Sequence, residues 1–525
     1  MRRSHPAFRT WWPILVLLLV GAAFLLPGLG RPVMNREQEL RVALTARVMA
    51  DGGDWLRPEF LGESRLRKPP LMYWAVAVSY LTAGTTSSPT VARMPSAVAG
   101  LLLLALVYAC TAPSLGRRRA LVAALICGTS FVFIKQARLA ETDTLLCLGT
   151  TAAALALYHA LTHPGTRSAW WLAGLASGLG FLTKGPAALV LPAAAALVFV
   201  ATTPVARRAA TPARVAISLL IFALIALPWY VLILQEGAGL TQVRDELARA
   251  AATSEHPGPP YYYAYTIIHA TAPWGLALPG ALWWAWRRRG QPLLRFALGW
   301  LGSSVLILSL LESKQLHYAL LVVPPASLLL SSWLGSGWSG RGQPRASANR
   351  MWAGFAWITL AAGLVTLGAA AWGDHELPFR PLVITGLYAT LAGGAAVWLR
   401  RSPALRMALV LCACLALTWC ASIRIMPALA RERVIEEAVL GAQGALQQAS
   451  HIIYCGPRNA IAEFYADRPL EVVMDPARAW RKARPSNVVI MVGPPDQLHL
   501  PVEPALLKTN RKLSCAILVK PAPVN

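Results

Sequence analysis

The sequence predicts an α-helical protein that crosses a membrane many times and carries a small α/β domain at its C-terminal end. Of its 525 residues, 56% are hydrophobic and only 14% are charged, so most of the chain favours hydrocarbon over water. Runs of about 20 apolar residues recur, the length that a helix needs to cross a bilayer about 30 Å thick. The last part of the chain instead combines helical stretches with short strand-like runs.

Fourteen apolar runs are candidates to cross the membrane. They lie near residues 11–29, 70–84, 94–113, 119–135, 144–162, 168–182, 186–202, 214–234, 263–286, 293–311, 316–334, 351–372, 380–398 and 405–422. The run at 11–29 is too long for the apolar region of a signal peptide, so we expect it to be the first span. The run at 70–84 is the weakest candidate, because it is short and follows Pro69.

Basic clusters between the runs predict the orientation, because short cytoplasmic loops are rich in Lys and Arg. The clusters are Arg117–Arg119, Arg167, Arg207 with Arg208, Arg287–Arg289, Arg341 with Arg345 and Arg350, and Arg400 with Arg401. All of them fall on one side only if the run 70–84 lies along the interface. We therefore expect thirteen spans, with the N-terminus inside and the C-terminus outside.

This topology divides the chain into two predicted domains. Residues 1–422 form a membrane domain with an outer juxtamembrane loop at 30–93, and residues 423–525 form an outer α/β domain. In the latter, a helical stretch at 431–448 precedes the strand-like runs HIIYCG, PLEVVM, NVVIMVG and LSCAILVK, with a short helix, AIAEFYA, between the first two. This domain shows no catalytic motif and is expected to cap or support the membrane part.

Neither the charge nor the cysteines indicate a nucleic-acid or metal-binding protein. The net charge of +25 comes from arginines in loops beside the membrane, where they contact lipids and suit phosphate binding. The eight cysteines show no metal spacing, and only Cys455 and Cys515 fall in a polar region. Whether these two form a disulfide stays open, because the sequence does not give their separation.

Charged residues gather in the loops expected on the outer side. In the first loop, Glu37, Glu39 and Arg41 begin a helical stretch, and a simple ion pair between Glu37 and Arg41 is the plainer interpretation. Lys68, with Arg65, precedes a helix that begins at a proline. Because basic residues oppose the dipole at a helix N-terminus, they suggest an anionic ligand, although snorkelling to lipid headgroups is the simpler alternative.

Later outer loops add residues of both signs. Arg138 and Asp143 lie at the mouth of a span, where Asp143 could merely cap the helix, and Lys184 lies between two spans. Further polar residues follow at Glu255, His256, Glu312, Ser313, Lys314, His317 and Tyr318. Together these loops suit a site that binds a phosphate-linked lipid and polarises a glycosidic bond.

Several segments in the first 330 or so residues resemble one family in the same order. They are QELRVALTARVMADGGDWLRPEFLGESRLRKPPLMYW, ARMPSAVAG, ARLAETDTLL, GLGFLTKGPAALVLP and, more weakly, SKQLHY followed by PP. This pattern resembles the GT-C glycosyltransferases that include aminoarabinose (lipid A) transferases and protein O-mannosyltransferases. The resemblance implies thirteen spans with an outer soluble domain. It also implies sugar transfer from a polyprenyl-phosphate carrier at the periplasmic face of the bacterial inner membrane.

The resemblance assigns roles residue by residue. The family's Asp-Glu-x-Arg-Tyr-Ala motif stands here as Gln38-Glu39-Leu40-Arg41-Val42-Ala43, so the Asp often taken as catalytic is Gln38, with Glu37 as a nearby carboxylate. The matches imply Glu39 and Asp143 as catalytic residues that orient the sugar or support its developing charge. The implied donor-phosphate ligands are Arg41, Lys68 and Lys184, with additional candidates in Glu37, Arg138, His256, Lys314 and Tyr318.

The resemblance also bears on metal and acceptor. In aminoarabinose transferases a Glu that helps hold a metal precedes the KPP lysine, but here that residue is Arg67, so the sequence leaves a divalent ion open, with His256 as a candidate ligand. A hydroxyl acceptor needs a base, whereas an ionised phosphate needs mainly positioning. Gln38 therefore favours a lipid acceptor such as lipid A.

Three alternatives to this function remain. One is a protein O-glycosyltransferase, and another is a catalytically silent relative that binds a polyprenyl phosphate without transferring sugar. A transporter is disfavoured, because no internal repeat is visible and the polar residues lie in outer loops instead of mid-span. The sequence does not indicate the sugar or the oligomeric state.

Overall fold

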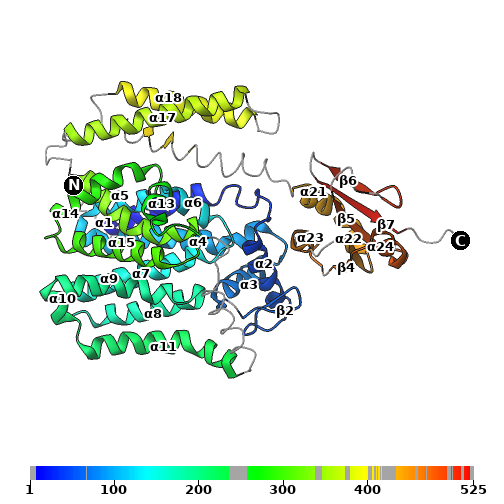
Figure 1. Ribbon diagram of the computed structural model, residues 1–525, viewed down its shortest axis with the longest axis horizontal. Helices are drawn as coiled ribbons and strands as arrows, with labels where there is room; N and C mark the ends of the chain where they lie inside the picture. The colour runs from blue at the N-terminus through cyan, green and yellow to red at the C-terminus, as the bar shows by residue number, and fades with distance from the viewer. Residues whose placement is uncertain are drawn as a thin grey trace.

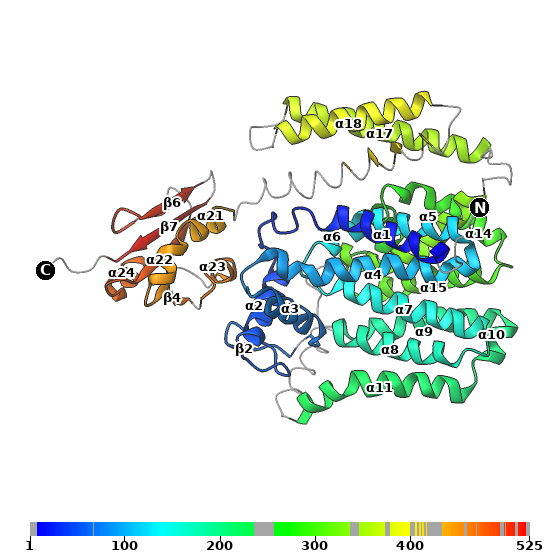
Figure 2. The same ribbon diagram turned by 180° about the vertical axis from the view of Figure 1, so that it is seen from behind.

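Most of the long helices of this protein lie side by side in one bundle, with α17 (Ala346–Trp372) and α18 (Phe379–Trp398) as a pair along its edge and a strand-containing domain beyond one end (Figure 1). The structure is a computed structural model that describes residues 8–66, 68–235, 257–336, 346–372 and 379–399, parts of 405–416, and 433–520 with short gaps. The view from behind shows the same arrangement, with both the outer loop and the C-terminal domain at the same end of the bundle (Figure 2).

The bundle contains helices that are long and apolar enough to cross a membrane, together with shorter apolar helices. Among the described residues, six helical segments pass on length and composition, and a bent pair makes up to seven. The helices of the bundle include α1 (Phe8–Leu25), α4 (Pro89–Leu115), α7 (Asp143–Thr162), α8 (Arg167–Lys184), α9 (Ala187–Thr202), α11 (Pro212–Gln235), α15 (Pro292–Leu310), α17 (Ala346–Trp372) and α18 (Phe379–Trp398). The chain is thus a multi-pass membrane protein, while the number of thirteen spans stays a prediction.

Two runs that the sequence predicted as single spans are broken. The run 119–135 becomes α5 (Arg117–Thr129) and α6 (Phe131–Ala137), which meet at 66°. Here the Phe131 amide donates to the carbonyl of Ala272 instead of to its own helix. The run 263–286 becomes α13 (Tyr262–Ala270), a short 3-10 helix (Trp274–Ala277) and α14 (Leu278–Arg287), because Pro273 has no amide hydrogen to continue the first helix.

The helix α16 (Val323–Ser336) is likewise preceded by a 3-10 segment, η2 (Leu316–Val322). This segment begins the span that the sequence predicted at 316–334. At the end of the bundle away from the C-terminal domain lies the short helix α10 (Pro204–Ala209), which carries basic residues in its last turn.

The first outer loop folds into two helices and a small hairpin at the end of the bundle. These are α2 (Glu37–Ala50), β1 (Glu59–Phe60), β2 (Glu63–Ser64) and α3 (Leu71–Ala83). The helix α3 packs beside α2, outside the row of long helices, which agrees with the expectation that the run 70–84 does not cross (Figure 1). Its buried side chains, such as Met72 and Val76, share an apolar core with Leu40 and Leu44 of α2.

The C-terminal domain is a five-stranded sheet with helices. Its elements are α21 (Arg433–Gly441), α22 (Gln443–Gln448), β3 (Ile452–Cys455), α23 (Ala460–Ala466), β4 (Glu471–Val473), α24 (Pro476–Lys482), β5 (Val488–Gly493), β6 (Leu506–Thr509) and β7 (Ser514–Val519). The strand order is β4-β3-β5-β7-β6, with β3 parallel to β4 and β5, and β7 antiparallel to β5 and β6.

The four strands and the short helix that the sequence predicted in this domain are all present. The helix α24 and strand β6 were not predicted, because α24 is only about two turns long and β6 is largely exposed. Cys455 and Cys515 are free. Strand β5 separates them, so at about 4.8 Å per strand they lie about 10 Å apart, beyond disulfide reach. The predicted boundary at 422/423 lies outside the described residues and stays a prediction.

Candidate active site

A carboxylate–lysine pair lies where two antiparallel helices meet the outer loop. Asp143 is the first residue of α7 and Lys184 is the last of α8, so each charge complements the dipole of its own helix. The Lys184 ammonium donates to Asp143 Oδ1 at 2.7 Å, and His317 Nε2 lies 3.9 Å from the same oxygen. The Tyr318 ring lies 4.7 Å from Lys184 Nζ and edge-on to His317. The structure thus brings together three predicted residues and one, His317, that the predicted set lacked.

A second cation, Lys68, faces the same cluster from the loop before α3. Its ammonium donates to Gln38 Oε1 at 2.8 Å, so the residue at the family's Asp position is the direct neighbour of the KPP lysine. Partial burial lowers the pKa of Lys68 to about 8, and repulsion by Lys184 adds to this effect more than Asp143 offsets it. Because Gln38 is neutral, Lys68 has no ion pair among the described residues and keeps its charge for an anionic ligand.

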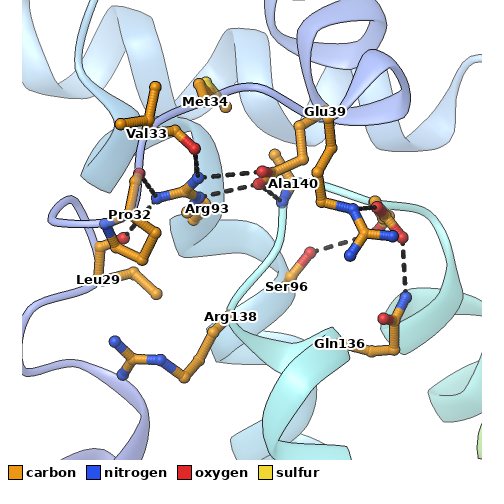
Figure 3. A network of polar contacts seen from close by, with 12 residues as sticks. Leu29, Pro32, Val33, Met34, Glu39, Arg93, Ser96, Gln136, Arg138 and Ala140 are labelled. Carbon is orange, nitrogen blue, oxygen red and sulfur yellow. Dashed lines mark hydrogen bonds and ion pairs between the residues drawn. The ribbon is translucent and has the colours of Figure 1, made fainter. Parts of the chain in front are cut away.

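Glu39, expected to be catalytic, is enclosed by protein. Arg93 of α4 binds it in bidentate fashion, with Nε to Oε1 at 2.8 Å and the second nitrogen to Oε2 at 3.0 Å, and neither side chain is exposed. The Ala140 amide donates to the same carboxylate at 2.8 Å, while Arg93 also binds the carbonyls of Leu29 and Pro32 (Figure 3). Glu39 thus ties together three segments and is enclosed by protein, a position that favours a structural role, and the expected catalytic role stays a prediction.

A further acidic residue, Glu141, lies beside this network. Arg36 forms an ion pair with it at 3.0 Å, and the Gln136 amide donates to its other oxygen at 2.8 Å. Burial raises the pKa of the Glu141 carboxyl, although Arg36 opposes this shift. Glu141 was quoted in the motif ARLAETDTLL but was not assigned a role. Its half-exposed partner Arg36 places another positive charge near the site.

Two predicted candidates have structural positions that explain their charge. The Arg138 guanidinium points away from the Glu39 network and donates to the carbonyls of Phe24 and Leu25 at the end of α1 (Figure 3). Lys314 is buried and donates to carbonyls at the end of α15, among them that of Ser309. Both side chains satisfy helix C-terminal carbonyls that have no partner within the helix, so they do not belong to the cluster around Asp143.

The remaining candidates are Glu37 with Arg41, and His256. Glu37 and Arg41 form the i,i+4 ion pair that was the plainer interpretation of their spacing, and a phosphate-binding role of Arg41 stays a prediction. His256 and Arg67 lie outside the described residues. Within the part of the chain that the structure describes, no three His, Cys, Asp or Glu side chains gather as metal ligands.

Around Asp143 the structure therefore combines two cations with one carboxylate and one imidazole. Lys68 and Lys184 can neutralise a phosphate, and Asp143 can stabilise a positive charge that develops on a bound sugar. The site lies beside α2 and α3 at the end of the bundle, where a lipid phosphate would sit if its chain lay along the helices. Such a site can bind an anionic lipid headgroup and hold it next to a carboxylate.

Comparisons with known proteins agree with this geometry. A family model described as dolichyl-phosphate-mannose-protein mannosyltransferase matches residues 67–231. The undecaprenyl phosphate-alpha-4-amino-4-deoxy-L-arabinose arabinosyl transferase of Serratia proteamaculans is 30% identical over 337 residues, which are 62% of this chain and 60% of that relative. The protein of the same name from Pseudomonas paraeruginosa is 29% identical over 413 residues, 74% of this chain and 71% of its own length.

The fold has a counterpart among solved structures. The crystal structure of ArnT from Cupriavidus metallidurans bound to undecaprenyl phosphate superposes with a TM-score of 0.76 at 18% identity, covering 97% of this chain and 99% of that one. This match includes the helical bundle and the C-terminal domain. The chain therefore has the GT-C glycosyltransferase fold and is a sequence relative of the undecaprenyl phosphate-aminoarabinose arabinosyl transferases.

Proposed function

We propose that this protein transfers a sugar from a polyprenyl-phosphate carrier to a lipid acceptor such as lipid A, at the periplasmic face of the bacterial inner membrane. The observation that carries the proposal is the cluster of Lys68 and Lys184 around Asp143, beside the outer loop. The names of the sequence relatives and the undecaprenyl phosphate in the structural counterpart support the same donor class. The C-terminal domain, at the same end of the bundle, then faces the periplasm as well.

The cluster suits a direct displacement at the sugar. An oxygen of the acceptor forms a bond to the anomeric carbon while the bond from that carbon to the carrier phosphate breaks. The carrier phosphate leaves with the bonding electrons, and Lys68 and Lys184 stabilise the negative charge that it gains. Asp143, held by Lys184 at 2.7 Å, faces the positive charge that develops on the sugar. Holding both substrates in line supplies much of the remaining acceleration.

The residue Gln38 favours an acceptor that does not have to lose a proton. An amide cannot take a proton from a hydroxyl group, so this position offers no general base. A phosphate acceptor is already ionised at neutral pH and loses no proton in the transfer. Gln38 therefore supports a phosphate-bearing lipid over a protein serine or threonine. The two alternative functions are a protein O-glycosyltransferase, favoured by the mannosyltransferase family model, and a silent relative that only binds the donor.

A transfer assay separates these functions. Purified protein in lipid bilayers receives a radiolabelled undecaprenyl-phosphate sugar together with lipid A, with lipid A stripped of its phosphates, or with Ser/Thr-rich protein. We expect label to move to intact lipid A and not to the other two acceptors. Transfer to protein would instead identify an O-glycosyltransferase, and donor binding without any transfer would identify the silent relative.

The short contact between Lys68 and Gln38 predicts a pH dependence of binding to the carrier, undecaprenyl phosphate. Lys68 is largely charged at pH 7, half charged at its pKa of about 8 and neutral well above it, so affinity for undecaprenyl phosphate should begin to fall between pH 7 and 8 and continue to fall at higher pH. The second ionisation of a phosphate monoester, near pH 6, is complete before this range. In Gln38→Asp the new carboxylate raises the pKa of Lys68, so the fall should begin about one pH unit higher.

The control for this titration is Lys68→Arg, whose guanidinium stays charged throughout. Its affinity should not fall between pH 8 and 9.5. An identical fall in wild type and Lys68→Arg, measured by microscale thermophoresis, would show that another group titrates.

The first loop also predicts insensitivity to chelators. Position 67 is an arginine, which carries a positive charge and is not a metal ligand. We therefore expect transfer to continue unchanged in excess EDTA, within about twofold, since the charges at the phosphate come from Lys68 and Lys184. A loss of activity with EDTA that zinc or magnesium restores would contradict this expectation.

A further inference from the structure

The C-terminal domain and the first outer loop share one buried core. Apolar side chains of α2 and α3, such as Leu44 and Val76, form a single cluster with Val439 of α21 and with Phe464 and Tyr465 of α23. A domain that merely hung from a linker would bury its own core and leave α2 with a separate one. The shared core fixes the position of α2 relative to the domain.

Arg47, near the end of α2, is the polar centre of this contact. Its guanidinium is almost fully buried and donates to the carbonyls of Glu463 at 3.0 Å and Phe464 at 2.7 Å, both in α23. It also donates to the carbonyl of Thr86, beyond α3, at 3.1 Å and lies 3.4 Å from an oxygen of Asp467. One side chain thus joins α2, the segment after α3 and the C-terminal domain.

A second polar contact lies at the other end of α2. The Tyr465 hydroxyl accepts a hydrogen bond from the Met34 amide at 3.0 Å, just before α2 begins. The domain therefore holds α2 both before its first turn and in its last turn. Because an α-helix rises 1.5 Å per residue, Arg47 lies only about 13 Å along the axis from Gln38. Any tilt of α2 released at Arg47 reaches the partner of Lys68.

We infer that the C-terminal domain contributes to donor binding by holding α2 in place. In this account Arg47 is a positioning residue: it orients α2 so that Gln38 contacts Lys68. The inference rests on the proposed function, in which this site binds a polyprenyl-phosphate carrier with or without its sugar. Arg47 itself does not touch the site. Arg47 acts through the position of α2, and the C-terminal domain to which it is hydrogen-bonded contributes no reacting group. Loss of the hydrogen bonds between Arg47 and the C-terminal domain separates Gln38 from Lys68 and removes the preorganisation of the phosphate-binding lysine.

The test is a double-mutant cycle in the full chain, read out by binding of undecaprenyl phosphate. Arg47→Met should weaken binding about tenfold, and Gln38→Ala should weaken it by a similar factor. If Arg47 acts through Gln38, the double variant should bind only as weakly as either single variant. Losses that multiply would mean that Arg47 acts elsewhere and would overturn the inference, because uncoupled sites give additive free energies.

A matched control lies inside the C-terminal domain. Arg468 is also an arginine that donates to backbone carbonyls, those of Leu446 and Ala449, and it makes these bonds within its own domain. Arg468→Met should destabilise the domain and leave donor affinity unchanged. Equal losses of affinity in Arg468→Met and Arg47→Met would mean that Arg47 affects donor binding only through the stability of the C-terminal domain.

A milder variant covers the case in which Arg47→Met fails to fold. Tyr465→Phe removes only the hydroxyl that accepts from Met34 and should weaken donor binding about threefold, again without effect in the Gln38→Ala background. Unchanged affinity in Tyr465→Phe, with full binding in wild type, would contradict the inference. Because binding alone is measured, these outcomes test the role of Arg47 even if no sugar transfer occurs. Absence of binding in wild type would instead contradict the proposed donor.

Discussion

Replacing Lys68 by methionine should weaken binding of the undecaprenyl-phosphate sugar donor about 100-fold, since loss of a close charge partner of a phosphate typically costs 2–5 kcal/mol. Methionine keeps a long unbranched side chain, so packing in the loop changes little while the charge is lost. Sugar transfer should fall by a larger factor than binding. The reason is that the carrier phosphate gains charge as it leaves, and Lys68 stabilises that charge more than the charge of the bound donor.

Two further variants serve as controls for Lys68→Met. Lys68→Arg keeps the charge and should retain most of the binding. Lys482→Met removes an exposed lysine of α24 that pairs with Glu471 in the C-terminal domain, and it should bind donor like wild type. Affinity in Lys68→Met within threefold of wild type, measured in the same bilayers, would remove Lys68 from the donor site.

Replacing Arg93 by methionine should give the largest loss of stability, about 3–5 kcal/mol, because it leaves the Glu39 carboxylate buried without its partner. Arg93 and Glu39 are both inaccessible to solvent, and Arg93 also binds the carbonyls of Leu29 and Pro32. The free energy of unfolding can be measured by SDS titration in mixed micelles, followed by circular dichroism. Transfer activity should fall in parallel with the folded fraction.

The matched control is Arg57→Met. Arg57 also pairs with a carboxylate, Asp54, but both side chains are largely exposed, so its loss should change the free energy of unfolding by less than about 0.5 kcal/mol. Arg93→Met with full stability and a selective loss of turnover would instead return Glu39 to the catalytic role that the family resemblance implied.

Much of the fold could be predicted because it depends on composition and period. Long apolar runs predicted the helices of the bundle, and strand-like runs such as NVVIMVG predicted the sheet of the C-terminal domain. The breaks that divide two predicted spans, after Thr129 and at Pro273, could not be predicted, because they depend on each other. The first depends on a hydrogen bond from Phe131 to Ala272, a contact between segments about 140 residues apart along the chain.

The site was predicted unevenly for a similar reason. Lys68, Lys184 and Asp143 lie in short motifs beside helix ends, and the structure brings all three to one end of the bundle. Glu39 matched the family motif equally well, but its partner Arg93 lies in another helix, so its burial could not be read from the motif. An arginine inside an apolar helix must find a partner, and this is the feature of ARMPSAVAG that could have revealed the pair.

His317 was named among the polar residues of the outer loops, but no role was predicted for it. It stands next to Tyr318 in SKQLHY, and its approach to Asp143 depends on η2 packing against α7, which the sequence does not specify. Its distance of 3.9 Å from the carboxylate makes it a neighbour of the charge cluster without a direct hydrogen bond.

The most direct test of the proposed transfer is the release of undecaprenyl phosphate from its labelled sugar donor by purified wild-type protein in bilayers that contain lipid A. We expect release and labelled lipid A to appear in equal amounts, and both to be lost in Lys68→Met. Donor that stays intact with wild-type protein, although it binds and lipid A is present, would contradict the account.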